Sequence, residues 1–237
     1  MPLRNWFSGG SKDPGDRLQE ALALARAGDL EAAVATIFER FPQALEQLRA
    51  HGEPIDAGWL RLAAVLEYRS GSLKDASSSA ERALALETDA STWNLLGRIR
   101  SRLGRPDAEV AFRQAAALEP GAYVVPHRVT REHFAVLAEE ALAAIPPEFR
   151  ERLDNTLVVV DDLPEIDAVR EGEDPDLLGV YDGATAMDRG LPERIVLYQR
   201  NHEQVCGTEA ELRKEVNETM RHEIGHHFGM DEDELPY

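Results

Sequence analysis

Cysteine, basic residues and long apolar runs are all scarce in this chain of 237 residues. Its single cysteine, Cys206, cannot form an internal disulfide, so nothing ties the fold to an oxidising compartment. The chain has 26 lysines and arginines against 44 acidic residues, which gives a formal net charge of −18. Because nucleic acids and anionic membranes attract clustered positive charge, we expect neither as a partner. Residues 1–16 contain no apolar run that could act as a signal peptide, so we expect a cytoplasmic protein.

The composition changes near Pro120. Before it, alanine and leucine dominate with a helical period, and after it β-branched runs appear. We therefore predict a flexible N-terminus over 1–14, a helical repeat domain over 15–122 and a mixed domain over 123–237. The expected fold class is α+β, in which an all-α domain precedes a small α+β domain.

The front part of the chain repeats itself. Residues 59–63, WLRLA, return 34 positions later as residues 93–97, WNLLG. We expect helical hairpins that turn at glycines, namely Gly28, Gly71 and Gly104. These positions resemble the tetratricopeptide repeat, in which small residues let paired helices approach closely. The first hairpin should end at Pro42, and segment 43–58 fits the pattern poorly. An ordinary helical bundle is the alternative.

The back part mixes helices and strands. Thr130 is a plausible N-cap for a helix that reaches Ala144, where two prolines stop it. The acidic stretch 161–176 is expected to be a loop. Three strands and a final helix complete the prediction, at 156–160, 179–181, 194–199 and about 209–228.

The sequence from His222 to His226 reads H-E-x-x-H. On a helix, residues four apart share one face, so both imidazoles can reach one ion. Imidazole nitrogen suits zinc, and Glu223 between the histidines can accept a proton from the water that the ion activates. An apolar stripe packs the other side of this helix, at Leu212, Val216, Met220, Ile224 and Phe228. His227 falls near that stripe, so we interpret it as a packing residue and not a ligand.

The third ligand is harder to assign. Only eleven residues follow His226, too few for a glutamate on a later helix. Gly229 can end the helix and turn the chain back towards the metal. Glu232 then occupies the last position of the spacing H-E-x-x-H-x-x-G-x-x-H, and zinc accepts carboxylate oxygen. Asp231, one residue earlier, is the second choice, and a solvated acidic tail is the alternative interpretation.

Residues from about 130 to 237 resemble the minimal zincin-like metallopeptidase family. The resemblance rests on five blocks in order, REHFAVLAEEALAAIPPEFRERLDN, LVVVDD, DPDLLGVYDG, LPERIVLYQRN and HEIGHHFGMDEDEL. It implies a compact zincin fold, a zinc ion on His222 and His226, and Glu223 as the general base. Members usually carry aspartate at the position of Glu232, which keeps the third ligand open.

The resemblance also implies how a substrate binds. In zincins a peptide adds to an edge strand above the active-site helix, and RIVLYQ at 194–199 is the expected strand. Tyr181 or Tyr198 could stabilise an oxyanion, with simple packing as the favoured alternative. The remaining histidines, His127, His133 and His202, are isolated and are interpreted as surface or packing residues, and Cys206 is interpreted as inert.

These observations predict a Zn²⁺-dependent metallopeptidase that hydrolyses peptide bonds through metal-activated water. Its metal ligands are His222, His226 and Glu232, and its catalytic residue is Glu223. The expected partners are a protein or peptide substrate and a protein bound by the concave face of the repeats. The alternative is an adaptor whose zincin domain binds metal but turns over little, because a second acid of the tail closes the open coordination position.

Overall fold

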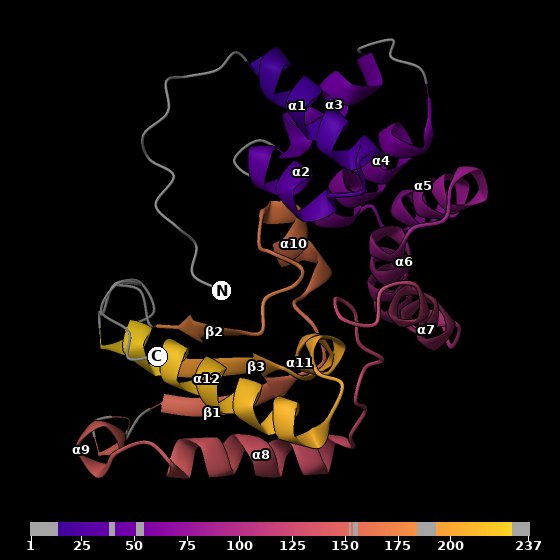
Figure 1. Ribbon diagram of the computed structural model, residues 1–237. Coiled ribbons are helices and arrows are strands. Elements are labelled where there is room, and N and C mark those ends of the chain that lie inside the picture. The colour runs from indigo at the N-terminus through magenta and orange to yellow at the C-terminus, as the bar shows by residue number, and fades with distance from the viewer. Residues whose placement is uncertain are drawn as a thin grey trace.

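The computed structural model describes residues 14–37, 41–50, 55–151, 153, 156–183 and 193–228. All but the last residue of the expected flexible N-terminus lies outside these ranges. Figure 1 shows seven helices in the first half of the chain and, below them, helices packed on a small sheet. We call residues 14–122 the repeat part and residues 123–228 the C-terminal part.

The repeat part is built from paired helices. The helices are α1 (Pro14–Arg26), α2 (Leu30–Ile37), α3 (Phe41–Ala50), α4 (Ala57–Arg69), α5 (Leu73–Leu86), α6 (Ala90–Arg102) and α7 (Ala108–Leu118). The predicted turn glycines lie between α1 and α2, α4 and α5, and α6 and α7. Their φ angles are 84° at Gly28, 74° at Gly71 and 66° at Gly104, a region that other residues rarely adopt. The hairpin pattern is therefore consistent with helical repeats.

Local sequence explains where the repeat helices start and how closely they pack. Asp56 and Asp89 are N-caps whose carboxylates accept hydrogen bonds from the amides of Trp59 and Thr92, each at 2.8 Å. A Cβ added to Gly97 of α6 would lie 2.7 Å from the ring of Phe112 on α7. This contact explains why the second copy of the motif ends in glycine, because only glycine lets the two helices approach so closely.

The prediction was incomplete between the first two hairpins. The sequence pattern ended the first hairpin at Pro42, whereas helix α3 begins at Phe41 and continues to Ala50. Proline near a helix start loses no hydrogen bond, because the first amides of a helix have no partner within it. Pro42 therefore opens a helix instead of closing a repeat.

The C-terminal part has five helices and three strands in its described residues. They are α8 (Arg131–Ala143), α9 (Pro147–Arg150), β1 (Thr156–Asp161), α10 (Ile166–Glu171), β2 (Gly179–Asp182), β3 (Glu193–Tyr198), α11 (Gln199–Val205) and α12 (Glu209–His227). The predicted first and last helices and all three strands are confirmed. The sequence pattern missed α11, which follows β3 without a loop, and α10, which lies in the stretch expected to be a loop.

The sheet has the order β1-β3-β2. Strand β3 pairs with β1 in parallel and with β2 in antiparallel register. Helices α8 and α12 lie side by side on one face of this sheet, with α8 near β1 and α12 near β2 and β3 (Figure 1). Their buried side chains meet Ile195 and Leu197 of β3 in one apolar cluster, separate from the cluster of the repeat part. The α+β class predicted from the sequence is confirmed.

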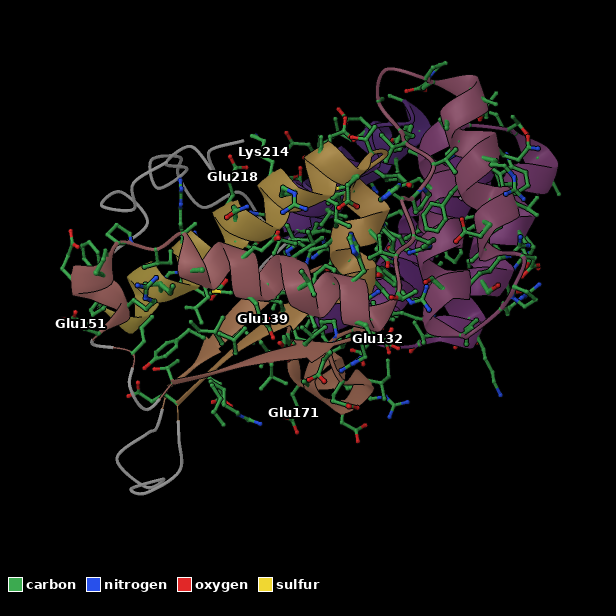
Figure 2. All side chains as sticks on the ribbon, turned by 90° about the horizontal axis from the view of Figure 1, so that it is seen from below. Glu132, Glu139, Glu151, Glu171, Lys214 and Glu218 are labelled. Atoms are coloured by element: carbon green, nitrogen blue, oxygen red, sulfur yellow. The ribbon has the colours of Figure 1, made fainter. Side chains whose placement is uncertain are left out.

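The outer surfaces of α8 and α12 are charged, and α12 carries exposed residues of both signs. Figure 2 shows Glu132 and Glu139 on the outer face of α8, and Lys214 and Glu218 on that of α12. Lys214 and Glu218 form an exposed ion pair at 3.2 Å. Within the described ranges, every helix is too short or too polar to cross a membrane.

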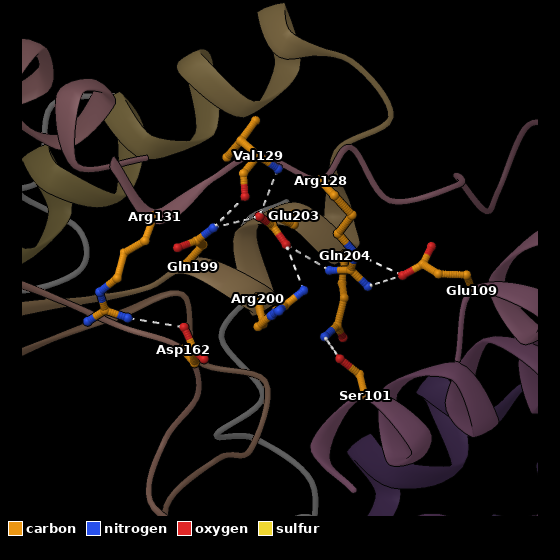
Figure 3. Close-up of polar contacts among 10 residues, drawn as sticks. All are labelled: Ser101, Glu109, Arg128, Val129, Arg131, Asp162, Gln199, Arg200, Glu203 and Gln204. Atoms are coloured by element: carbon orange, nitrogen blue, oxygen red, sulfur yellow. Dashed lines mark hydrogen bonds and ion pairs between the residues drawn. The ribbon is translucent and has the colours of Figure 1, made fainter. Parts of the chain in front are cut away.

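The two parts of the chain meet through charged contacts. Glu203 of α11 is fully buried and accepts hydrogen bonds from the guanidinium of Arg128 at 2.9 Å, the amide of Val129 at 3.1 Å and the side chain of Gln199 at 2.8 Å. Arg128 also donates to Glu109 on α7 at 2.9 Å. Figure 3 shows this network, which connects α11, the last repeat helix α7 and the linker, the segment 119–130 between α7 and α8.

Candidate functional site

Helix α12 carries the H-E-x-x-H motif, and its start is set by its sequence. The Thr208 hydroxyl accepts from the amide of Glu211 at 3.2 Å, and the Glu211 carboxylate accepts from the amide of Gly207 at 2.7 Å. This reciprocal arrangement satisfies amides that a helix start leaves without partners. The predicted apolar stripe is buried as expected, at Leu212, Val216, Met220 and Ile224.

His222 and His226 lie together away from that stripe. Both rings are half-buried, and their Nε2 atoms are 2.9 Å apart. The ring centroids are 4.5 Å apart and the ring planes are nearly perpendicular, at 85°. Two imidazole nitrogens bound to one tetrahedral zinc at about 2.0–2.1 Å lie roughly 3.3 Å apart. The 2.9 Å separation in the structure is thus slightly shorter than the separation of two nitrogens that share a zinc ion.

Glu223 lies between these histidines in sequence and is only 6% exposed. A Cβ added to Gly179 of β2 would lie 3.2 Å from Cγ of Glu223 and 2.8 Å from Cγ2 of Thr219. The lack of a side chain at Gly179 thus lets β2 approach α12 at the carboxylate. Glu223 is held against the first residue of β2, next to the two imidazoles in the motif.

The expected substrate strand was wrong. Strand β3, which contains most of RIVLYQ, is the central strand, and its main-chain groups already pair with β1 and β2. The edge strand beside α12 is β2. The amide of Tyr198 donates to the carbonyl of Leu178 at 2.8 Å, so Gly179 and Tyr181 fall at positions whose main-chain groups point away from β3. Those groups are oriented towards the side of β2 on which the described residues place no further strand.

The two candidate tyrosines differ in their placement. Alternation along the strands puts Tyr181 on the same face as Gly179, the face that α12 covers. Tyr198 lies on the opposite face, is 7% exposed, and has its pKa raised to about 12 by burial and by the nearby Glu173. Tyr198 is therefore a packed residue, and only Tyr181 is on the correct side to approach the histidines.

The third ligand position falls outside the described residues, since Asp231 and Glu232 both follow residue 228. The side chain of His227 is also outside the description, although its backbone belongs to α12. Across the described ranges, no three side chains of histidine, cysteine, aspartate or glutamate come together as a metal-binding group. The described part of the site is the pair of imidazoles and the adjoining carboxylate.

His202, interpreted from the sequence as a surface or packing residue, is a packing residue beside this site, and no sequence spacing indicates its contact with Thr219. His202 of α11 is fully buried, with Nδ1 2.9 Å from the carbonyl of Tyr198 and Nε2 3.1 Å from the hydroxyl of Thr219. Its ring packs edge-on against Phe134 at 5.3 Å. Burial lowers the pKa of His202 to about 4, so the ring is neutral at pH 7 and can accept the Thr219 hydrogen. Thr219 lies one turn before Glu223 on α12.

The other isolated residues also have partners or are buried. His127 and His133 both contact the carboxylate of Glu209, at 3.3 and 2.8 Å, near the start of α12. Cys206 is buried, and burial raises the pKa of its thiol to about 12, so the thiol stays protonated at pH 7. No sequence spacing relates these histidines to Glu209, because the contact joins the linker and α8 to α12.

Comparison with known proteins now bears on the site. Residues 153–237 match the family of zincin-like metallopeptidases. The matched region contains the edge strand β2, the other two strands, and helix α12 with its H-E-x-x-H motif. No curated protein matches the chain. Zincin-like metallopeptidases typically bind zinc, in agreement with the pair of imidazoles.

Proposed function

We propose that this chain is a zinc-dependent peptidase. The observation that carries the proposal is the 2.9 Å approach of the His222 and His226 Nε2 atoms beside the buried carboxylate of Glu223. His222, His226 and Glu232 would hold the ion, with Asp231 as the other candidate for the third position. Zinc, when bound, supplies the Lewis acidity that activates water and polarises a peptide carbonyl.

In this proposal, Glu223 acts as the general base. Its carboxylate accepts a proton from the attacking water and then delivers that proton to the leaving amine. The Glu223 side chain is buried, with its Cγ against Gly179, and this burial restricts its rotamers. The neutral ring of His202 accepts the Thr219 hydroxyl, which helps hold α12 in place beneath Glu223.

The substrate would bind as an extended peptide along β2. Main-chain groups of Gly179 and Tyr181 face the side of β2 that carries no other described strand, and a peptide that pairs with them adds a fourth strand to the sheet. Such a peptide would pair with the strand whose first residue contacts Glu223, on the helix that also carries the two histidines. This placement favours cleavage of an unfolded or extended segment. The repeats would recruit the protein that carries it.

The test compares zinc content and peptide cleavage across matched variants. Wild type should contain about one zinc per chain and cleave members of a peptide library, whereas His222→Ala and His226→Ala should lose the metal. Glu223→Gln should keep zinc and fold but lose about 10²–10⁴ in rate, because glutamine cannot accept the proton. Glu218→Gln, an exposed acid on the same helix, is the matched control.

The competing function is an adaptor that binds metal without turnover. That function requires wild type and Glu223→Gln to behave alike on every peptide, with contaminating protease excluded by a chelator control. Retained zinc in both histidine variants would contradict the ligand assignment for either function. Glu232→Ala and Asp231→Ala, compared for zinc affinity, distinguish the two candidates for the third ligand.

A further inference from the structure

The repeat part carries a basic face that contacts the C-terminal part. We use the term basic face for three arginines and the tyrosine that lies with them. Tyr68 and Arg69 are at the C-terminal end of α4, and Arg98 and Arg102 belong to α6. The segment that it contacts is the acidic run 173–176, Glu-Asp-Pro-Asp, which we call the acidic segment. The acidic segment lies in the connection between β1 and β2.

Asp176 is the centre of this contact. The Tyr68 hydroxyl donates to Asp176 Oδ1 at 2.7 Å, and Arg98 Nη1 lies 3.0 Å from Oδ2. Arg69 pairs with the neighbouring Asp174 at 2.9 Å. Burial by itself raises the pKa of Asp176, but Arg98, the Tyr68 hydroxyl and Arg69 outweigh burial and lower the pKa overall. The carboxylate is therefore ionised and tightly paired at neutral pH.

The backbone of the connection is held by the same face. Arg102 donates to the carbonyl of Pro164 at 3.0 Å and to that of Pro175 at 2.7 Å. Helix α10 packs on the turn between α4 and α5, where a Cβ added to Gly71 would lie 2.9 Å from Cγ of Arg170. Figure 1 shows α10 between the repeat helices and the sheet. The repeat part thus holds the connection between β1 and β2 both through its backbone carbonyls and through α10.

The acidic segment leads directly into the strand beside the catalytic site. Only Leu177 and Leu178 separate Asp176 from Gly179, the residue that packs on Glu223. Asn201 of α11 also holds this stretch, through the carbonyls of Pro175 and Leu177 at 2.9 and 2.7 Å. The stretch is therefore held from both sides, by α11 and by the basic face.

We propose that the basic face of the repeats positions β2, and with it the substrate-binding edge, through the docked acidic segment. Asp176 is then a positioning residue for the peptidase. This role rests on the proposed function of β2, and it makes the repeat part a component of substrate binding. Charged pairs suit this task because their directional hydrogen bonds fix one orientation, whereas an apolar contact can slide.

The test uses the full chain with Asp176→Asn and Tyr68→Phe. Asp167→Asn is the matched control, because Asp167 lies in the same connection, is highly exposed and pairs with Arg170 of its own helix at 2.8 Å. Hydrogen exchange of the amides in residues 178–182 should be at least about tenfold faster in Asp176→Asn and moderately faster in Tyr68→Phe. The amides of α8 and of β1 should exchange as in wild type. The control should match wild type everywhere.

Kinetics supply a second readout. Both variants should raise KM for a cleaved peptide by about tenfold with little change in kcat, because they weaken the binding edge and leave Glu223 intact. Unchanged exchange in residues 178–182 would overturn the proposal. Uniformly faster exchange throughout the C-terminal part would also overturn it, since the contact would then serve stability alone. If wild type cleaves nothing, the proposed function fails while the exchange experiment still decides the positioning role.

Should Asp176→Asn fail to fold, Tyr68→Phe carries the test. Phenylalanine keeps the ring, which is 2% exposed in the core of the repeat part, and removes only the hydroxyl that reaches Asp176. Exchange in residues 178–182 that matches wild type in Tyr68→Phe would then overturn the proposal.

Discussion

Acid should destabilise this protein through His202, and the structure sets the size of the effect. The ring is fully buried, is bonded at both nitrogens and contacts Phe134 at its edge. Burial lowers its pKa from 6.5 to about 4. The unfolded chain takes up this proton as the pH falls through 6.5, whereas the folded chain resists it until about pH 4. Falling pH in this window therefore favours unfolding.

A tenfold change in proton affinity corresponds to about 1.4 kcal/mol, so the difference between 6.5 and about 4 gives a ceiling of about 3 kcal/mol. At pH 5 the loss should already be about 2 kcal/mol relative to pH 8. The assay is urea unfolding of wild type and His202→Gln at pH 8, 7, 6 and 5. A chelator should be present throughout, so that metal binding by His222 and His226 does not titrate with pH.

Glutamine can occupy the same space and accept from Thr219 but does not titrate, so His202→Gln should lose about 2 kcal/mol less than wild type between pH 8 and pH 5. Other groups titrate equally in both proteins and cancel in the comparison. His133→Gln, an exposed histidine in contact with Glu209, controls for the loss of any histidine. Parallel stability curves for wild type and His202→Gln would refute the reasoning.

Three further substitutions and one fragment test the remaining contacts. Gly179→Ala should destabilise by about 1–3 kcal/mol in urea unfolding, because its Cβ meets Thr219 and the Val196 carbonyl, whereas Gly121→Ala, with open space around it, should have little effect. Thr208→Ala should cost about 0.5–2 kcal/mol by removing the cap of α12. Glu203→Gln should lower the free energy of unfolding by about 1.5–3 kcal/mol, because it weakens the hydrogen bond with Arg128. Its control, Glu139→Gln at an exposed position, should leave that free energy unchanged. A fragment of residues 123–237 should fold and bind zinc, because its apolar cluster is separate from that of the repeats; insolubility beside a stable full chain would contradict this boundary.

Local signals in the sequence predicted most of the elements. The cap at Thr130, the turn glycines and the four-residue apolar spacing of α12 all act over short stretches of sequence, so pattern alone identified α8, α12 and the hairpin turns. The spacing of His222 and His226 is also local, and it placed both rings on one face of one helix. Features that depend on three or four neighbouring residues were therefore predictable.

Features that depend on distant pairing were not. The strand order decides which strand lies at the edge of the sheet. The apolar run in 194–199 does not indicate whether that strand pairs with one other strand or with two. The run is in fact buried from Ile195 to Tyr198, which is typical of a central strand. Strand β2 is shorter and begins with glycine, and that glycine is needed only because α12 passes close to it. The edge strand could therefore be identified only from the pairing of β3 with both β1 and β2.

The acidic residues illustrate most clearly this difference between features set by local sequence and features set by distant contacts. A net charge of −18 suggests acids that serve solubility, and exposed residues such as Glu139 and Glu218 agree with that interpretation. Asp176 and Glu203 do not serve solubility, because both are paired at the junction of the two parts. Asp176 accepts a hydrogen bond from Tyr68, and Glu203 accepts one from Arg128. An ion pair at a buried junction is costly to desolvate unless its geometry is good, so such a pair constrains orientation more than it adds stability. The junction that decides where β2 lies is therefore made of charges whose partners lie far away in the sequence, and composition alone could assign them only to solvent.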